Sequence, residues 1–162
     1  MDQVLSRLER LYHEVGPGLL AYLHRRLADR HAAEDLLQET FLTAVRGRDR
    51  LSQAVSARAW LYAIARNLAA TAIRRRRLNE SLPENVPAAS AYEQPHQEAI
   101  RAAIAELPDV LRETLELRLR CELTYEEIAA VLDIPVGTVR SRLHLALRRL
   151  RAAVRGQEED QG

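Results

Sequence analysis

Residues 123–150 read LTYEEIAAVLDIPVGTVRSRLHLALRRL, and this stretch decides how the second half of the chain folds. Thr124 is followed three residues later by Glu127 and then by an apolar run, which is the capping-box pattern that starts a helix. Asp133 and Pro135 should end this helix early, because proline has no backbone N–H and disfavours a helical conformation in the residue before it. Since proline is well tolerated in the first turn of a following helix, the sequence predicts two helices that meet at a sharp turn.

The second of these helices has one apolar side and one basic side. Its apolar residues recur every three or four positions, which places them on one buried stripe: Val139, Leu143, Ala146, Leu150 and Val154. The other side and its flanks carry small polar and basic residues, and residues 134–157 contain no acidic residue: Thr138, Arg140, Ser141, Arg142, His144, Arg148, Arg149, Arg151 and Arg155. A short capped helix, a tight turn and a basic second helix are typical of a helix-turn-helix, whose second helix enters the major groove of DNA. The alternative is a solvated basic helix near a chain end.

The composition favours an all-helical protein with a nucleic-acid-binding surface. The chain has 162 residues, of which 47% are hydrophobic and only 4% aromatic, and this indicates helices built on leucine and alanine. The net charge is +1, yet residues 1–77 carry 14 arginines against 8 acidic residues. Such a local excess of positive charge is typical of proteins that bind nucleic acids.

Several classes of site are not supported by the sequence. The single cysteine, Cys121, excludes a disulfide framework within the chain, and the five histidines show no metal-ligand spacing. We find no signal-peptide pattern and no segment approaching the roughly 20 apolar residues that span a bilayer. We therefore expect a cytoplasmic protein that binds no metal or other cofactor and is not inserted into a membrane.

The first half of the chain shows helical spacing as well. Residues 2–28 predict a helical segment that is broken or bent at Gly16-Pro17-Gly18. Residues 32–45 predict a further helix, and residues 46–56 a loop. The helix should turn one side to a core and the other to solvent or to a partner: Leu37, Phe41, Ala44 and Val45 on the first side, and Asp35, Gln38, Glu39 and Leu42 on the second.

Residues 56–77 predict a second basic helix. Its expected core side is Leu61, Ile64, Ala65, Leu68 and Ala72, and its far side is Ala63, Arg66, Asn67, Ala70, Arg74 and Arg77. Small residues between arginines let a phosphate backbone approach closely, and four consecutive arginines at 74–77 add positive charge. Trp60, at the edge of this helix, is either a core residue, as the spacing favours, or a platform on which an unpaired base stacks.

These elements predict two small helical domains joined by a flexible linker. We place the N-terminal domain at residues 1–77, the linker at 78–97, the C-terminal domain with the helix-turn-helix at 98–155, and a frayed acidic tail at 156–162. The linker assignment rests on three prolines, three glutamates and the absence of any basic residue. In the C-terminal domain, four leucines should supply the apolar side that packs against the helix-turn-helix: Leu111, Leu115, Leu117 and Leu119.

Two separately placed motifs coincide with one known family. AEDLLQETF at residues 33–41 followed by AWLYAIARNLA at 59–69 resembles the first domain of a group IV, or extracytoplasmic-function, bacterial sigma factor. YEEIAAVLDIPVGTVRSRL at residues 125–143 resembles the C-terminal domain of the same family. The resemblance covers nearly the whole chain in the family's order. It implies a promoter-specificity subunit of RNA polymerase, not an enzyme, and an anti-sigma factor as a further partner.

The resemblance also implies roles for individual residues. Asp35, Gln38 and Phe41 match the helix with which such factors bind core RNA polymerase. Trp60, Arg66, Asn67, Arg74 and Arg75 match the region that recognises and melts the minus-ten element of promoter DNA, where the loop before Trp60 captures a flipped base. Thr138, Arg140, Ser141, Arg142, His144 and Arg148 match the helix that reads the minus-thirty-five element.

Three residues depart from the family pattern. Thr71 stands where an aspartate is usual, and Leu145 and Leu147 stand where basic residues are common. The residues alone also allow two other functions: a two-domain repressor or activator with a C-terminal helix-turn-helix, and a helical interaction module. The repressor or activator does not explain the polar face of residues 35–42. The interaction module explains neither the motifs of the first domain nor the helix-turn-helix motif.

Overall fold

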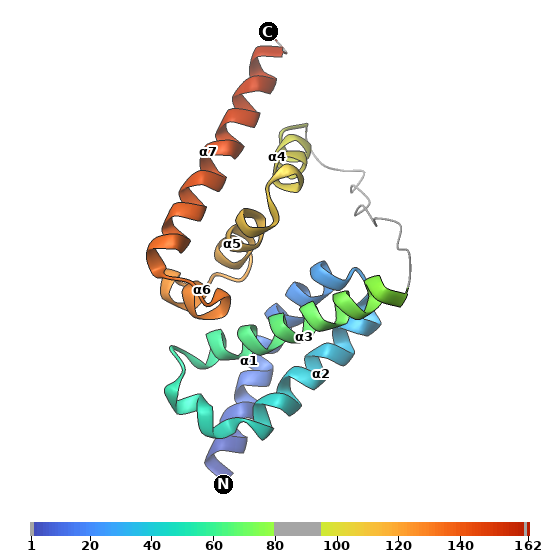
Figure 1. Ribbon diagram of the computed structural model, residues 1–162, viewed down its shortest axis with the longest axis vertical. Coiled ribbons are helices and arrows are strands. Elements are labelled where there is room, and N and C mark those ends of the chain that lie inside the picture. The colour runs from blue at the N-terminus through green and yellow to red at the C-terminus, as the bar shows by residue number, and fades with distance from the viewer. Residues whose placement is uncertain (1, 80–94, 161) are drawn as a thin grey trace. The chain divides into compact units, whose positions relative to one another are not determined.

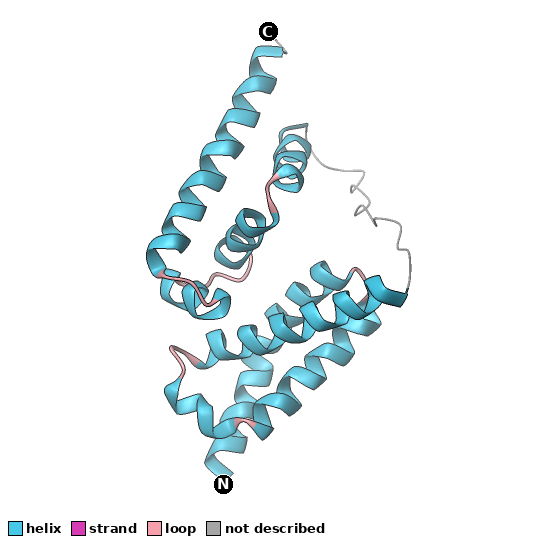
Figure 2. Ribbon diagram, viewed as in Figure 1, coloured by secondary structure: helices cyan, strands magenta, loops and turns pink. Residues whose placement is uncertain are grey.

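The computed structural model describes residues 2–79, 95–160 and 162 (Figure 1). All regular structure in these residues is helical, so the predicted all-α class is confirmed (Figure 2). The chain divides into two compact units. The first contains α1, α2, the 3-10 helix η1 and α3, and the second is formed mainly by α4 to α7. Their bounds are α1 Asp2–Leu27, α2 Arg30–Arg46, η1 Arg48–Gln53, α3 Ala57–Asn79, α4 Pro95–Glu106, α5 Asp109–Leu119, α6 Tyr125–Leu132 and α7 Val136–Asp160.

Helix α1 is continuous through Pro17, so of the break or bend predicted at Gly16-Pro17-Gly18, the break is wrong. At Gly18 the small residue serves packing. A Cβ atom there would lie 2.9 Å from the hydroxyl of Tyr62, a buried residue of α3, so a larger residue would force the Tyr62 side chain to shift. Burial of the flanking α1 residues outweighs the hydrogen bond that Pro17 cannot donate.

The junction between α1 and α2 is a tight corner. Ala28 has a left-handed backbone (φ 53°), and the Asp29 carboxylate then caps α2 by accepting from the Ala32 amide at 3.2 Å. The core of the first unit includes large side chains from α1 and α3, among them Leu19, Leu23 and Leu61, each 0% exposed.

The segment between α2 and α3 contains η1, where a loop was predicted. Leu51 of η1 is buried, and this contact explains why an otherwise polar segment adopts regular structure. Helix α3 then begins at a capped end, because the Ser56 hydroxyl accepts from the Ala59 amide at 3.0 Å. Its core stripe differs slightly from the prediction: Ile64, Leu68 and Ala72 are only half-buried, while the buried residues are Ala59, Leu61, Tyr62, Ala65 and Ala69.

The predicted linker falls mostly on residues 80–94, which lie outside the described residues. Its two described ends are helical, since α3 continues to Asn79 and α4 begins at Pro95.

The second unit is built around a leucine-rich core. Leu117, Leu123, Ile128 and Val139 are fully buried, and they come from α5, the turn after it, α6 and α7. Leu119, predicted to belong to this core, is 61% exposed because it ends α5 on the outer side of its last turn.

Helix α7 runs to Asp160, so most of the tail that was predicted to be frayed, residues 156–162, is helical. Residues 151–160 are nevertheless almost all exposed. The end of α7 is therefore a helix with little core contact.

Candidate nucleic-acid interface

The capping box predicted at the start of α6 is confirmed. The Thr124 amide donates to Glu127 Oε1 at 3.0 Å, and the Glu127 amide donates to Thr124 Oγ1 at 3.1 Å. Glu127 is 6% exposed, so its carboxylate is held in place by the backbone of the preceding turn. The reciprocal pair satisfies two amides at the helix start and fixes the angle at which the chain enters α6.

The turn between α6 and α7 is also formed by local contacts. Asp133 has a left-handed backbone (φ 54°), and the Ile134 amide donates to the Ala129 carbonyl at 3.1 Å. The Pro135 carbonyl then accepts from the amides of Thr138 and Val139, at 3.0 and 3.2 Å. The short capped helix, the turn and the long second helix are thus those of a helix-turn-helix.

Helix α7 separates an apolar side from a basic side as its spacing predicted. Val139, Leu143 and Ala146 are buried, and Leu150 and Val154 are half-buried where the core ends. Arg140, Ser141, His144 and Arg148 are exposed, and Thr138 and Arg142 are half-buried. The predicted DNA-reading side chains therefore occupy a surface that offers hydrogen-bond donors and, within residues 134–157, no carboxylate.

An aromatic ring that sequence reasoning did not single out lies next to this surface. The guanidinium of Arg118 lies 4.9 Å from the centre of the Tyr125 ring, and that of Arg140 lies 6.0 Å from it. Arg118 also donates to the Leu123 carbonyl at 3.0 Å. Cation–π contacts of this kind orient Arg140 at the start of α7.

Helix α3 carries the second predicted DNA-binding set. Asn67, Arg74 and Arg75 are exposed, whereas Arg66 and Trp60 are half-buried. These positions follow one another along most of the length of α3.

The edge of the Trp60 ring lies close to the chain before η1, because a Cβ atom at Gly47 would be 3.6 Å from Trp60 Cζ2. Thr71, which departs from the family pattern, donates its hydroxyl to the Asn67 carbonyl at 3.1 Å.

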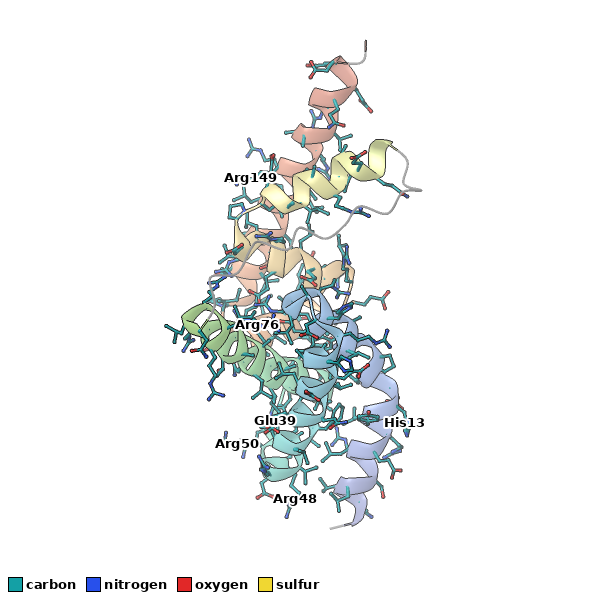
Figure 3. All side chains as sticks on the ribbon, turned by 90° about the vertical axis from the view of Figure 1, so that its right-hand side faces the viewer. His13, Glu39, Arg48, Arg50, Arg76 and Arg149 are labelled. Carbon is teal, nitrogen blue, oxygen red and sulfur yellow. The ribbon has the colours of Figure 1, made fainter. Side chains whose placement is uncertain are left out.

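Arg76 differs from its three arginine neighbours. Its Nη1 donates to the Leu27 carbonyl at 2.7 Å, and its Nη2 lies 3.7 Å from the Asp29 carboxylate. Figure 3 labels Arg76 on α3, from which it reaches the corner between α1 and α2. This contact spans 49 residues of sequence, and no local pattern signals it. Arg76 therefore holds the fold together, while Arg74, Arg75 and Arg77 are exposed.

On α2, Asp35 and Gln38 are exposed, but Phe41 is buried at 9% exposure. The Phe41 ring packs edge-on against Tyr12 of α1, with ring centres 5.0 Å apart. The three residues thus do not form one exposed face, because Phe41 lies on the core side that the spacing also predicted. Glu39, labelled in Figure 3, lies 3.6 Å from Arg46 on the same helix.

None of the helices in the described residues is long and apolar enough to cross a membrane. Within the same residues, no group of three or more histidine, cysteine, aspartate or glutamate side chains is placed to hold a metal ion.

Both halves of the chain match known domain families. Residues 11–78 match Sigma-70 region 2, and residues 97–150 match Sigma-70 region 4. A relative from Rhodopseudomonas palustris, the ECF RNA polymerase sigma factor EcfG, is 34% identical over 84% of this chain and 78% of its own. The chain belongs to the extracytoplasmic-function family of RNA polymerase sigma factors. The sigma factor YlaC of Bacillus subtilis is 31% identical over 95% of both chains.

A solved structure agrees with this assignment. The sigma factor RpoE of Bartonella quintana, in complex with the anti-sigma factor NepR, has a TM-score of 0.70 and 25% identity over 91% of this chain and 96% of its own. This sigma factor is therefore an initiation factor for promoter-specific transcription and not an enzyme. The repressor and interaction-module alternatives fail, because neither accounts for a match to Sigma-70 region 2.

Proposed function

We propose that the two units divide promoter recognition between them. Helix α7 reads the minus-thirty-five element through Thr138, Arg140, Ser141, Arg142, His144 and Arg148, and α3 with the preceding loop recognises the minus-ten element through Trp60, Arg66, Asn67, Arg74 and Arg75. The N-terminal unit binds core RNA polymerase through the exposed face of α2 that carries Asp35 and Gln38. We also propose that residues 1–77 form the N-terminal domain, 78–97 the linker, 98–155 the C-terminal domain and 156–162 the acidic tail.

The observation that carries the proposal is the exposed basic side of α7. Arg140, Ser141 and His144 lie within the first three turns after a capped helix and a tight turn, where a recognition helix contacts base edges. Arginine donates two parallel hydrogen bonds to guanine in the major groove, and serine contacts several bases. Ser141 Oγ donates to the Gly137 carbonyl at 2.9 Å, which leaves its oxygen to accept from a base.

Strand opening follows from binding, without an energy-consuming step. A base that leaves the stack is stabilised when it enters a protein pocket or stacks on an aromatic ring. Trp60 supports such a role because it is half-buried beside Gly47, so its ring is held in place and still reaches the surface. Exposed Arg74 and Arg75 offer guanidinium groups to the adjoining phosphates.

In polymerase binding, we assign Phe41 a supporting role and not a direct contact. Its ring holds α2 against α1, and Asp35 and Gln38 then project from a helix whose orientation is fixed.

Each contact with DNA is weak alone. Binding both units to one polymerase raises the effective concentration of the second contact.

Regulation by an anti-sigma factor is part of the proposal. The solved relative RpoE was crystallised with such an inhibitor, NepR. A protein that covers the exposed α2 face would prevent polymerase binding. The proposed activity also places this sigma factor in the cytoplasm, where the polymerase acts.

In vitro transcription tests the proposal. Purified chain and core RNA polymerase are combined with a library of promoter fragments, and the transcribed fragments are sequenced. We expect fragments with two shared elements, at the minus-ten and minus-thirty-five positions. An Arg140→Ala variant should relax the preference at the upstream element and leave the downstream element unchanged. A library transcribed without any shared upstream element would refute the role of α7.

A further inference from the structure

The ring of Tyr125 lies where side chains from three helices of the second unit come together. Tyr125 is the first residue of α6 and is half-buried, whereas Arg118 in the last turn of α5 and Arg140 of α7 are exposed. The guanidinium carbons of the two arginines lie 4.9 and 6.0 Å from the centre of the ring, within the range of cation–π contacts. Arg118 is held a second time, by its 3.0 Å hydrogen bond to the Leu123 carbonyl.

The position of the ring is fixed by local hydrogen bonds. Tyr125 follows Thr124 and precedes Glu127 by two residues, so its backbone lies inside the capping box, whose two hydrogen bonds are 3.0 and 3.1 Å long. A tyrosine side chain has few rotatable bonds, so a fixed backbone and the contact with Arg118 leave the ring little freedom. The ring is therefore a rigid surface beside a more flexible side chain, Arg140.

Arg140 is the residue whose freedom matters for base reading. A long arginine side chain loses rotamer freedom when it donates two parallel hydrogen bonds to a guanine. Ordering such a side chain at an interface lowers affinity by about twofold to tenfold. This loss falls only on complexes in which the arginine engages its base. A ring that orders Arg140 beforehand therefore favours the matching sequence over all others, and a cation–π contact leaves N–H donors of the guanidinium for the base edge.

We propose that Tyr125 is a positioning residue for recognition of the minus-thirty-five element and that it acts through Arg140. The ring restricts the directions in which Arg140 projects from α7, and Arg118 supports the ring from α5. Tyr125 thus determines how well bases are discriminated, and not how strongly DNA of any sequence is bound. This inference rests on the proposed function, in which Arg140 reads a base.

Two variants of Tyr125 test the inference. Tyr125→Leu removes the ring and keeps an apolar side chain at a half-buried position, whereas Tyr125→Phe keeps the ring and removes only the hydroxyl. Transcription by the full chain with core polymerase is measured on promoters randomised at the minus-thirty-five element. At the base position that Arg140→Ala relaxes, Tyr125→Leu should lower the discrimination by about twofold to tenfold, and Tyr125→Phe should keep it. The slope of log affinity against log salt should stay the same in both variants, because no phosphate contact is lost.

The double variant Y125L/R140A shows whether the ring acts through the arginine. Two residues that act as a unit have non-additive effects. Once Arg140 is replaced, loss of the ring should not change the base preference further, whereas a ring that only supported the fold or itself touched DNA would add its own effect. Arg118→Gln should lower discrimination in the same direction as Tyr125→Leu. Its matched control is Arg120→Gln, at an exposed position just after α5, which should leave discrimination unchanged.

Three results would overturn the inference: an unchanged base preference in Tyr125→Leu, a further loss in the double variant, or a loss of discrimination in Tyr125→Phe equal to that in Tyr125→Leu. The last result would assign the effect to the hydroxyl. Circular dichroism checks that each variant folds, and if Tyr125→Leu unfolds the second unit, an unchanged preference in Arg118→Gln overturns the inference instead. Failure of the proposed function is distinguishable, because the unaltered chain itself would then show no preference at the minus-thirty-five element.

Discussion

Replacing arginines 74–76 should separate DNA contact from support of the fold. In Arg76→Gln, the protein loses a 2.7 Å hydrogen bond to the Leu27 carbonyl and a 3.7 Å ion pair with Asp29. A hydrogen bond made by a charged group contributes about 1.5–3 kcal/mol, and an exposed ion pair about 0–1 kcal/mol. The Arg76 side chain is 31% exposed, so solvent screening favours the lower part of this range. We expect the free energy of unfolding of the N-terminal unit to fall by about 1.5–2 kcal/mol.

The matched variant is R74Q/R75Q, which changes two exposed side chains. Exposed substitutions of this kind alter stability by about 0.5 kcal/mol or less. If both arginines contact duplex phosphates, the slope of log affinity against log salt for promoter DNA should fall by about 1.8, or 0.9 for each contact. Arg76→Gln should leave this slope unchanged.

One residue provides the assay for stability. Trp60 is the only tryptophan, and it lies in the N-terminal unit, so its fluorescence during urea denaturation reports on that unit alone. Promoter binding is measured with the polymerase complex at several salt concentrations. The reasoning would be refuted if Arg76→Gln unfolded at the same urea concentration as the unaltered protein and lowered the salt slope as its neighbours do.

Three further predictions follow from burial and capping. D35A/Q38A should weaken binding to core polymerase in a pull-down with less than about 0.5 kcal/mol loss of stability, whereas Phe41→Ala should lower the stability of the N-terminal unit by about 3 kcal/mol or more. Thr124→Ala should lower the free energy of unfolding of the second unit by about 1 kcal/mol, and with it the temperature at which the helices of that unit melt. The unfolding of the N-terminal unit, followed by Trp60 fluorescence, should not change. Leu145→Arg, at a position 40% exposed, should strengthen transcription from many minus-thirty-five variants in an unchanged rank order; a new order would show that Leu145 reads bases.

The features that sequence predicted best are those set by neighbours in the chain. The capping box at Thr124 and Glu127 and the buried stripe from Val139 to Ala146 depend on spacings of three and four residues. Both are formed as predicted, because the hydrogen bonds and the core contacts that they need lie within one helix or one turn.

The features that sequence missed depend on contacts between distant segments. Gly16-Pro17-Gly18 has the composition of a helix breaker, yet α1 continues through it, with Gly18 beside the buried Tyr62 of α3. The Arg76 contact with Leu27 joins residues far apart in sequence. In α1, tertiary packing overrode the local preference of the sequence. At Arg76, it gave the side chain a structural role that no local sequence pattern indicates.

In the N-terminal unit, the arginines at 74–77 and the set Asp35, Gln38 and Phe41 each combine residues that face a partner with a residue that supports the fold. Successive helical residues turn by about 100°, so four adjacent arginines cannot face the same partner. Arg76 turns toward the α1–α2 corner while its neighbours face outward, and Phe41 turns into the core while Asp35 and Gln38 face outward. Loss of polymerase binding in a Phe41 variant would therefore arise from a displaced α2. Only a variant that keeps the Trp60 unfolding transition can assign a direct contact, and this holds for D35A/Q38A but not for Phe41→Ala.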